Sequence, residues 1–419
     1  MSAGATLSEK VLARASGRES VRPGDIVDAR VDLAMSHEAC TFVIKSFREM
    51  GAKKVWDKDK IVIILDHWVP ASDVKSAGLH KTIRDFVNEQ GIDNFLDVGR
   101  GGIAHQILAE DGWVLPGMLV VGADSHTPTA GALGAFATGI GFTEMAAVFA
   151  LGELWLRVPE NLKVIMDGSM GPRMDGKDIV LNVIGQLKVD GAIYKAIEFT
   201  GSTVDSIGIS HRLTICNMAT EMGAKTGIIS PDDKTEEYLA WTGKEYAAIR
   251  SDEDAVYQEE RNFIISHLEP QVACPPNVDN VKGVSELKDV KVHQAFLGSC
   301  TNGRIEDLRA AAEILKGEKI HKDVRMIVMP ASQKIYHQAM KQGLFDIFLE
   351  SKATICAPSC GPCFGGHGGL LAVGEACISS TNRNFVARMG HPESLVYLAS
   401  PWTVAASALY GEITDPRSV

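Results

Sequence analysis

Short runs of apolar residues alternate along the chain with longer amphipathic stretches. Residues 60–65 have the sequence Lys-Ile-Val-Ile-Ile-Leu, and a helical pattern through residues 80–89 follows them after a turn. Continuous apolar runs of about four to eight residues are typical of strands that are buried on both faces. The alternation predicts an α/β fold with mostly parallel sheets covered by helices. Comparable apolar runs occur at 118–122, 164–166, 292–297, 324–329 and 352–356.

Polar residues with chemical capability follow several of these predicted strands. In parallel α/β sheets, ligands bind in the crevice beyond the carboxyl ends of the strands. We therefore expect the residues at the strand ends to face a common site. They are Asp66 and His67 after the first run, Asp124, Ser125 and His126 after the second, and residues 298–303 after the run at 292–297.

Composition narrows the class of protein. The 419 residues, 45% of them hydrophobic and 23% charged, fit a globular protein of two to four domains. No apolar run is long enough for a membrane span, and residues 1–10 lack the pattern of a secretory signal. A net charge of −11 argues against a nucleic-acid partner, although local arginines can still bind an anionic substrate. Eight cysteines without a paired framework favour a cytoplasmic protein.

The densest chemical signal is the segment 356–369, where Cys356, Cys360 and Cys363 precede a glycine-rich turn. Cys360 and Cys363 have the dithiol spacing of thioredoxin-like proteins, but the following Phe-Gly-Gly-His-Gly-Gly is a poor start for the helix that this chemistry requires. The three cysteines also have the spacing of the radical S-adenosylmethionine motif. That motif opens a large barrel, whereas only residues 364–419 follow Cys363.

Two further interpretations add Cys300, at another predicted strand end and before a predicted helix at 304–315. A structural zinc site would use Cys300, Cys360, Cys363 and His367. The alternative is a [4Fe–4S] cluster on the three cysteines. A cluster with four cysteine ligands transfers electrons, whereas three ligands leave one iron free to act as a Lewis acid. The other five cysteines we interpret as small core or loop residues: Cys40, Cys216, Cys274, Cys356 and Cys377.

Several separated motifs together resemble the aconitase superfamily and, more narrowly, the large subunits of short-type 3-isopropylmalate dehydratase and homoaconitase. The motifs are Asp66-His67, His105-Gln106, 122–127, 217–224, 298–304, Cys360-x2-Cys363 and 381–388. The resemblance runs almost from end to end. It implies an aconitase-like α/β fold of three α/β/α domains, with mostly parallel sheets around a central cluster site. We expect these domains at 1–160, 161–280 and 281–419, with a connector at 274–280.

The resemblance also implies a role for each matching residue. Cys300, Cys360 and Cys363 would hold a [4Fe–4S] cluster in which one iron lacks a protein ligand. Asp66 and His67 would be the catalytic pair that protonates the leaving hydroxyl. His105 and Asp124 would be a second catalytic pair near iron-bound water. The other catalytic residues, beside that pair, would be Ser125, His126 and Glu221. The substrate-binding residues would be Arg383, Arg388, Asn217 and His37. The sequence Gly-Pro between Cys360 and Cys363 differs from many bacterial relatives, which leaves the subtype open.

The residues themselves allow simpler interpretations beside these roles. Loss of hydroxide needs an acid at the oxygen, and a histidine oriented by a carboxylate supplies one. Asp66 could instead cap a structural element, with His67 a satisfied core histidine. Asn217 and Glu221, four residues apart, could share a helical face and form a surface hydrogen bond. Arg383 could be a surface residue, although its turn suits bidentate carboxylate binding.

The resemblance predicts a hydro-lyase that isomerises a hydroxy-dicarboxylate by dehydration and rehydration. The first choice is conversion of 2-isopropylmalate to 3-isopropylmalate in leucine biosynthesis. Homoaconitate hydratase, 2,3-dimethylmalate dehydratase and a citraconate-type hydratase are the alternatives. An RNA-binding regulator or a structural metal protein is the non-enzyme alternative. No candidate base for the carbon-bound proton stands out, and the final swivelling domain of single-chain aconitases does not follow residue 419. We therefore expect a separate small subunit, without which the chain is inactive.

Overall fold

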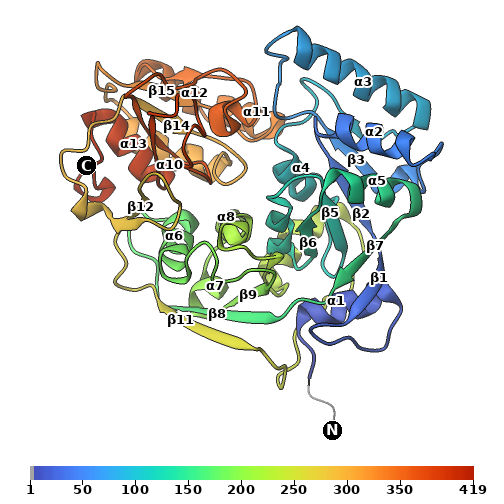
Figure 1. Cartoon of the computed structure of the whole chain (residues 1–419). Coiled ribbons are helices and arrows are strands. Elements are labelled where there is room, and N and C mark those ends of the chain that lie inside the picture. The colour runs from blue at the N-terminus through green and yellow to red at the C-terminus, as the bar shows by residue number, and fades with distance from the viewer. Residues whose placement is uncertain (1–3) are drawn as a thin grey trace.

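The computed structural model describes residues 4–419, and its strands form four sheets (Figure 1). The N-terminal part carries a five-stranded parallel sheet in the order β4-β3-β2-β5-β6. Its strands are β2 Leu33–Ser36, β3 Ile61–Ile64, β4 Phe95–Leu96, β5 Leu119–Gly122 and β6 Phe136–Gly139. The helices of this part are α1 Leu7–Ser16, α2 Cys40–Glu49, α3 Val74–Gln90, α4 Ala104–Glu110 and α5 Phe142–Leu151. An antiparallel pair, β1 Ile26–Arg30 and β7 Glu153–Arg157, lies beside them.

The apolar run of β3 is buried because its alternate side chains enter two different cores. Ile61 and Ile63 pack in the core that contains α2, α3 and α5. Val62 and Ile64 face the other way, into a core shared with α4 and with the middle part of the chain. Since successive strand residues point to opposite faces, an all-apolar strand follows from burial on both sides.

The middle part is a four-stranded parallel sheet in the order β10-β9-β8-β11. Its strands are β8 Asn161–Asp167, β9 Ala196–Thr200, β10 Thr226–Ile228 and β11 Glu259–Ile264. Its helices are α6 Gly176–Leu187, α7 Ser202–Ser206, α8 Ile209–Asn217 and α9 Asp233–Leu239. Figure 1 shows this green part lying below the blue N-terminal and the orange-red C-terminal parts.

The C-terminal part is a seven-stranded sheet in the order β13-β12-β18-β17-β14-β15-β16. Only β12 pairs antiparallel, with β13 and β18. The strands are β12 Gln271–Ala273, β13 Val281–Gly283, β14 Gln294–Leu297, β15 Arg325–Val328, β16 Thr354–Ile355, β17 Ala376–Ser379 and β18 Leu395–Leu398. The helices are α10 Ile305–Leu315, α11 Gln333–Lys341, α12 Leu344–Glu350 and α13 Pro401–Tyr410.

These elements confirm the predicted α/β class with mostly parallel sheets. The expected connector at 274–280 is instead the loop between the paired strands β12 and β13. Because β12 belongs to the seven-stranded sheet, we propose that the third domain begins before Gln271 rather than at residue 281. Between residues 4 and 419, no helix has the length and apolar character needed to cross a bilayer.

One core cluster joins the three parts. Side chains of β2 and β3, of β8 and β9, and of β14 and β18 all contribute buried residues to it. Two further cores lie to the outside, one in the N-terminal and one in the C-terminal part. Fixed packing between the parts matters for the site, because its side chains come from all three.

Candidate active site

Asp66 and His67 lie just beyond the end of β3, and their side chains form a hydrogen-bonded pair. Asp66 Oδ1 lies 2.6 Å from His67 Nδ1, and the other carboxylate oxygen accepts a 2.8 Å hydrogen bond from the backbone N–H of Ala104 at the start of α4. Burial alone would lower the pKa of His67, but the charge and hydrogen bond of Asp66 and the charge of Glu38 raise it to about 10. His67 is therefore an imidazolium at neutral pH. Asp66 orients the imidazole ring of His67 and also accepts from the first backbone N–H of α4.

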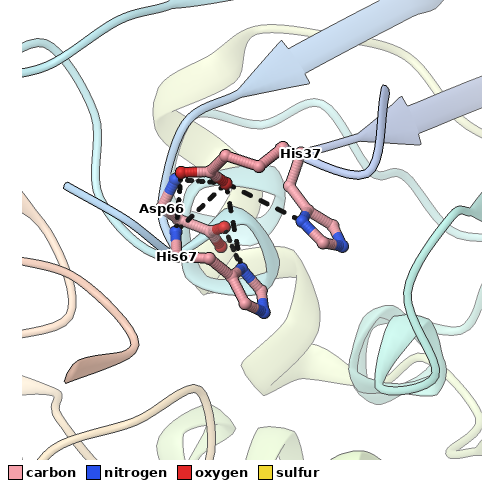
Figure 2. Close-up of side chains that lie close together, drawn as sticks. His37, Asp66 and His67 are labelled. Atoms are coloured by element: carbon pink, nitrogen blue, oxygen red, sulfur yellow. Dashed lines mark hydrogen bonds and ion pairs between the residues drawn. The ribbon is translucent and has the colours of Figure 1, made fainter. Parts of the chain in front are cut away.

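His37 follows β2 and lies against this pair. Figure 2 shows the side chains of His37, Asp66 and His67 gathered together. The two imidazole rings stack with centroids 4.2 Å apart and planes inclined by 15°. His37 Nε2 lies 3.5 Å from Asp124 Oδ2, so His37 bridges the Asp66–His67 pair and the next strand end.

Asp124 follows β5 and organises the second predicted pair. Its Oδ1 lies 2.7 Å from His105 Nε2 and accepts a 2.8 Å hydrogen bond from the backbone N–H of His126. Burial opposes the charge of Asp124, yet His105, His126 and His37 hold its pKa well below the usual range. The other ring nitrogen of His105, Nδ1, is buried and has no partner among the described residues.

Glu221 links the N-terminal and C-terminal parts at the site. Its Oε1 lies 2.9 Å from His126 Nε2 and accepts a 2.8 Å hydrogen bond from Arg383 Nε. Burial raises the pKa of a carboxyl group, but these two partners outweigh it and lower the pKa of Glu221. Ser125 is exposed beside them, and its Oγ lies 3.4 Å from His126 Nδ1. The ion pair with Glu221 uses the Nε–H of Arg383, so the N–H groups of the two terminal nitrogens remain for a substrate carboxylate.

The three predicted cysteine ligands are buried and face the same region. Cys300 Sγ accepts hydrogen bonds of 3.2 Å from the side-chain amides of both Asn217 and Asn382. Cys363 Sγ lies 3.5 Å from Asn382 Oδ1. The backbone N–H of Cys360 donates a 2.8 Å bond to the carbonyl oxygen of Asp66, so the cysteine turn is joined to the acid pair.

The spacing of the sulfur atoms tests which inorganic group the cysteines fit. One tetrahedral zinc ion would bring its sulfur ligands to about 3.8 Å from one another. In the described chain, only His37, Glu38, Asp66 and His67 form a group of three or more such residues whose ligand atoms all lie within 4.8 Å. The sulfur atoms of Cys300, Cys360 and Cys363 do not form such a group in the described chain. Three buried cysteine thiols are a donor set of the kind that iron–sulfur clusters use.

Burial keeps two of the cysteine thiols protonated in the absence of a metal. Burial, followed by the charge of Cys363, raises the pKa of Cys300 to about 12, and the pKa of Cys360 is raised well above its usual value. Thiols in this setting ionise when metal cations bind them. The amide donors of Asn217 and Asn382 then meet a thiolate.

One predicted arrangement differs in the structure, and the predicted role of Arg388 stays a prediction. Glu221 does not share an α-helical face with Asn217, because α8 ends at Asn217 and a 3-10 turn, Met218–Met222, follows. The tighter turn directs Asn217 to Cys300 and Glu221 to His126. Arg388 lies in the same loop as Arg383, and its Nε is buried with no partner in the described part of the chain.

Two residues outside the predicted set also shape the site. Glu38 is a buried carboxylate beside His37. Lys177 is fully buried near the start of α6, and its Nζ donates to the carbonyl oxygens of Ser380 (2.9 Å) and Thr381 (2.7 Å). Lys177 thereby holds the loop that leads to Arg383. Glu38, next to a predicted site residue, could have been suspected from its position, whereas the sequence contains no local signal for Lys177.

Comparison with known proteins agrees with this arrangement. The sequence model of the Aconitase family (aconitate hydratase) matches residues 9–289 and 280–411. The chain belongs to the aconitase family. Membership of this family implies an iron–sulfur cluster. A solved structure with the same fold, aconitase X of Thermococcus kodakaraensis in its holo-form, has a TM-score of 0.51 at 12% identity, with 85% of this chain and 84% of that chain covered.

Curated members of the aconitase family match this chain over nearly its whole length. It is 54% identical over 416 residues to "3-isopropylmalate dehydratase large subunit 1" of Methanopyrus kandleri, with 99% of both chains covered. The corresponding large subunits of Archaeoglobus fulgidus and Syntrophus aciditrophicus are 52% and 51% identical, again over 99% of each chain.

Proposed function

We propose that this chain is the large subunit of 3-isopropylmalate dehydratase, a hydro-lyase that interconverts 2-isopropylmalate and 3-isopropylmalate. The observation that carries the proposal is the identity of 54% over 99% of both chains to a curated large subunit of that enzyme. The site supports the reaction class independently, because it combines an imidazolium acid, a second carboxylate–histidine pair and an arginine around three cysteines. A structural metal protein would need none of the first three.

The cofactor of the proposed enzyme is a [4Fe–4S] cluster on Cys300, Cys360 and Cys363. When bound, a cluster with three protein ligands supplies one iron as a Lewis acid for the substrate's hydroxyl and carboxylate groups. Three buried thiols, which do not form a group of the kind that holds a single ion in the described chain, support this cofactor. The amides of Asn217 and Asn382 direct their N–H groups at Cys300 Sγ, and such hydrogen bonds stabilise a thiolate ligand.

His67 is the proposed acid for the leaving hydroxyl group. Its Nδ1 is bound to Asp66, so the proton on Nε2 is the one that remains to be donated. A positioned acid of this kind contributes about 10²- to 10⁴-fold to the rate. The pKa of about 10 keeps His67 in the acid form throughout the neutral range.

The second wall of the site holds and orients the substrate. We assign His105 and Asp124 to the side where water leaves and returns, because the buried Nδ1 of His105 lacks a partner in the described chain. Arg383 binds a substrate carboxylate and is itself oriented by Glu221. A cavity of about 770 Å³ lies beside this wall and is lined in part by His37, Asp124 and Ser125.

The active enzyme needs a second polypeptide in this proposal, since the matching relatives are named as large subunits. The test is to prepare the chain anaerobically, alone and together with a small subunit, and to measure the alkene and hydroxy-acid products. We expect turnover of 3-isopropylmalate only with the small subunit. Preference for homoaconitate, 2,3-dimethylmalate or citraconate would change the substrate assignment. Full turnover by the single chain would contradict the requirement for a partner.

A further inference from the structure

Glu38 is a buried carboxylate on which three consecutive backbone N–H groups converge. It lies two residues beyond β2 and is 1% exposed. The backbone N–H of Asp66 donates to Oε2 at 3.2 Å, that of Trp68 donates to Oε1 at 3.0 Å, and that of His67 lies 3.0 and 3.1 Å from the two oxygens. The chain that leaves β3 is therefore folded around this side chain.

A fourth donor fixes the carboxylate from the opposite side. His80 Nε2, on α3, lies 3.3 Å from Glu38 Oε1, and His37 Nδ1 lies 3.7 Å from Oε2. Burial opposes ionisation of Glu38, but its polar contacts with His37 and His80 and the charge of His67 hold its pKa well below the usual range. Glu38 thus presents an anion with both oxygens engaged.

Glu38 also belongs to a group of four side chains that has the composition of a metal site. The ligand atoms of His37, Glu38, Asp66 and His67 all lie within 4.8 Å of one another. However, the oxygens of Glu38 already accept from backbone N–H groups, and the 2.6 Å bond between Asp66 and His67 occupies Oδ1 and Nδ1. A metal ion would have to displace these hydrogen bonds, so the group is better described as a hydrogen-bonded network.

We propose that Glu38 is a positioning residue that fixes the turn presenting Asp66 and His67 to the substrate. This inference rests on the proposed function, because it concerns how the acid of that reaction is held. The turn also carries the carbonyl oxygen of Asp66 that accepts from the backbone of Cys360. Its shape therefore sets the place of the acid relative to the cysteine turn. A displacement of about 1 Å at such a group can lower the rate about 100-fold.

Two substitutions distinguish the effect of the Glu38 charge and its two acceptor oxygens from the effect of the space that the side chain fills. Glu38→Gln keeps the size of the side chain, but its NH2 group then faces backbone donors that need an acceptor. Glu38→Asp keeps both oxygens and the charge, although it is shorter. If Glu38 only fills space, Gln retains more activity than Asp. If it positions the turn through its two oxygens, Asp retains more than Gln.

The experiment uses the full chain with its small subunit and measures kcat and KM together with amide exchange of residues 66–68. For Glu38→Gln we expect kcat to fall about 100-fold with KM changed less than about threefold, and exchange in the turn to rise about tenfold. Glu9→Gln is the matched control. Glu9 is a 2% exposed carboxylate in the same part of the chain, where it accepts from the backbone of Thr6 at 2.7 Å.

Each outcome decides the inference. A Glu38→Gln enzyme with unchanged kcat and unchanged exchange, or one more active than Glu38→Asp, overturns it. Losses of the same size in Glu9→Gln also overturn it, because they would reflect general destabilisation. If the wild-type complex does not turn over 3-isopropylmalate, the proposed function fails. The exchange of the 66–68 amides in the two Glu38 variants then still tests the positioning role.

Discussion

Replacing Asp66 by Asn keeps the shape of the side chain but removes the charge that holds His67 as an imidazolium. Both partners of Asp66 are donors at neutral pH: His67 Nδ1 at 2.6 Å and the backbone N–H of Ala104 at 2.8 Å. An amide has one acceptor oxygen, so its NH2 group must oppose one of them. The variant should fold, because the amide oxygen of Asn can still accept from the backbone N–H of Ala104.

The size of the effect follows from the pKa of His67. Its ordinary value is 6.5, and the site raises it to about 10, with Asp66 the largest of the raising causes. If the substitution returned the pKa of His67 to its ordinary value of 6.5, only about 3% of this histidine would be in the acid form at pH 8. General acid catalysis contributes about 10²- to 10⁴-fold. We therefore expect kcat of Asp66→Asn at pH 8 to fall about 30-fold, in proportion to the loss of the acid form.

The pH dependence has a definite sign. A raised pKa means that the stabilisation of the fold by His67 is complete below pH 6.5 and disappears as the pH rises through about 10. The catalytic acid is present over the same range. In Asp66→Asn the alkaline limb of the kcat profile should therefore move to lower pH. The difference in unfolding free energy between the variant and the wild type should also shrink as the pH rises.

The assay is turnover of 3-isopropylmalate by the two-subunit complex at matched iron content, measured from pH 6 to pH 10. Asp73→Asn is the control, because Asp73 caps α3 through a 2.7 Å bond from the backbone N–H of Ser76 and pairs with no histidine among residues 4–419. A kcat within about threefold of the wild type, with the alkaline limb unmoved, would refute the assignment of His67 as the acid.

Three further predictions concern the cysteines, the arginine and an ion pair in the middle part of the chain. Cys300→Ser should lose most of the iron and acid-labile sulfide found by chemical analysis, whereas Cys356→Ser should lose none. Arg383→Met should raise KM about 10- to 100-fold in initial-rate assays, because a charged hydrogen bond to the substrate carboxylate contributes about 1.5–3 kcal/mol. Arg212 Nη2 lies 2.5 Å from Asp232 Oδ2, and despite the burial that opposes it, this partner holds the pKa of Asp232 at about 2. The stabilisation is therefore present above pH 4 and lost as the pH falls towards 2, and urea unfolding of Arg212→Met should lack this dependence.

Much of the fold could be predicted from the sequence because parallel strands buried on both faces are continuously apolar. The runs at 60–65, 118–122 and 292–297 correspond to β3, β5 and β14. Strands of two or three residues, such as β4 and β13, carry no such pattern. They form because neighbouring strands offer them backbone partners, and the sequence of a short segment does not reveal those neighbours.

The site was predictable where its residues follow long strands, and less so where contacts depend on the packing of distant segments. Asp66 and Asp124 stand at strand ends, which the apolar runs mark. Glu38 acts on backbone groups about 30 residues away, and this contact exists only because β2 and β3 are neighbours in the sheet. Lys177 is fully buried, whereas a lysine is expected at the surface from its residue type alone.

The central claim is that three thiolates of this chain hold an iron–sulfur cluster with one iron free of protein ligands. The most direct measurement is iron and acid-labile sulfide content of anaerobically prepared protein, combined with low-temperature Mössbauer spectra before and after addition of 3-isopropylmalate. We predict about four irons and four sulfides per chain, with the spectrum of one iron altered by the substrate. One equivalent of zinc without sulfide, or four irons that do not respond to the substrate, would contradict the account.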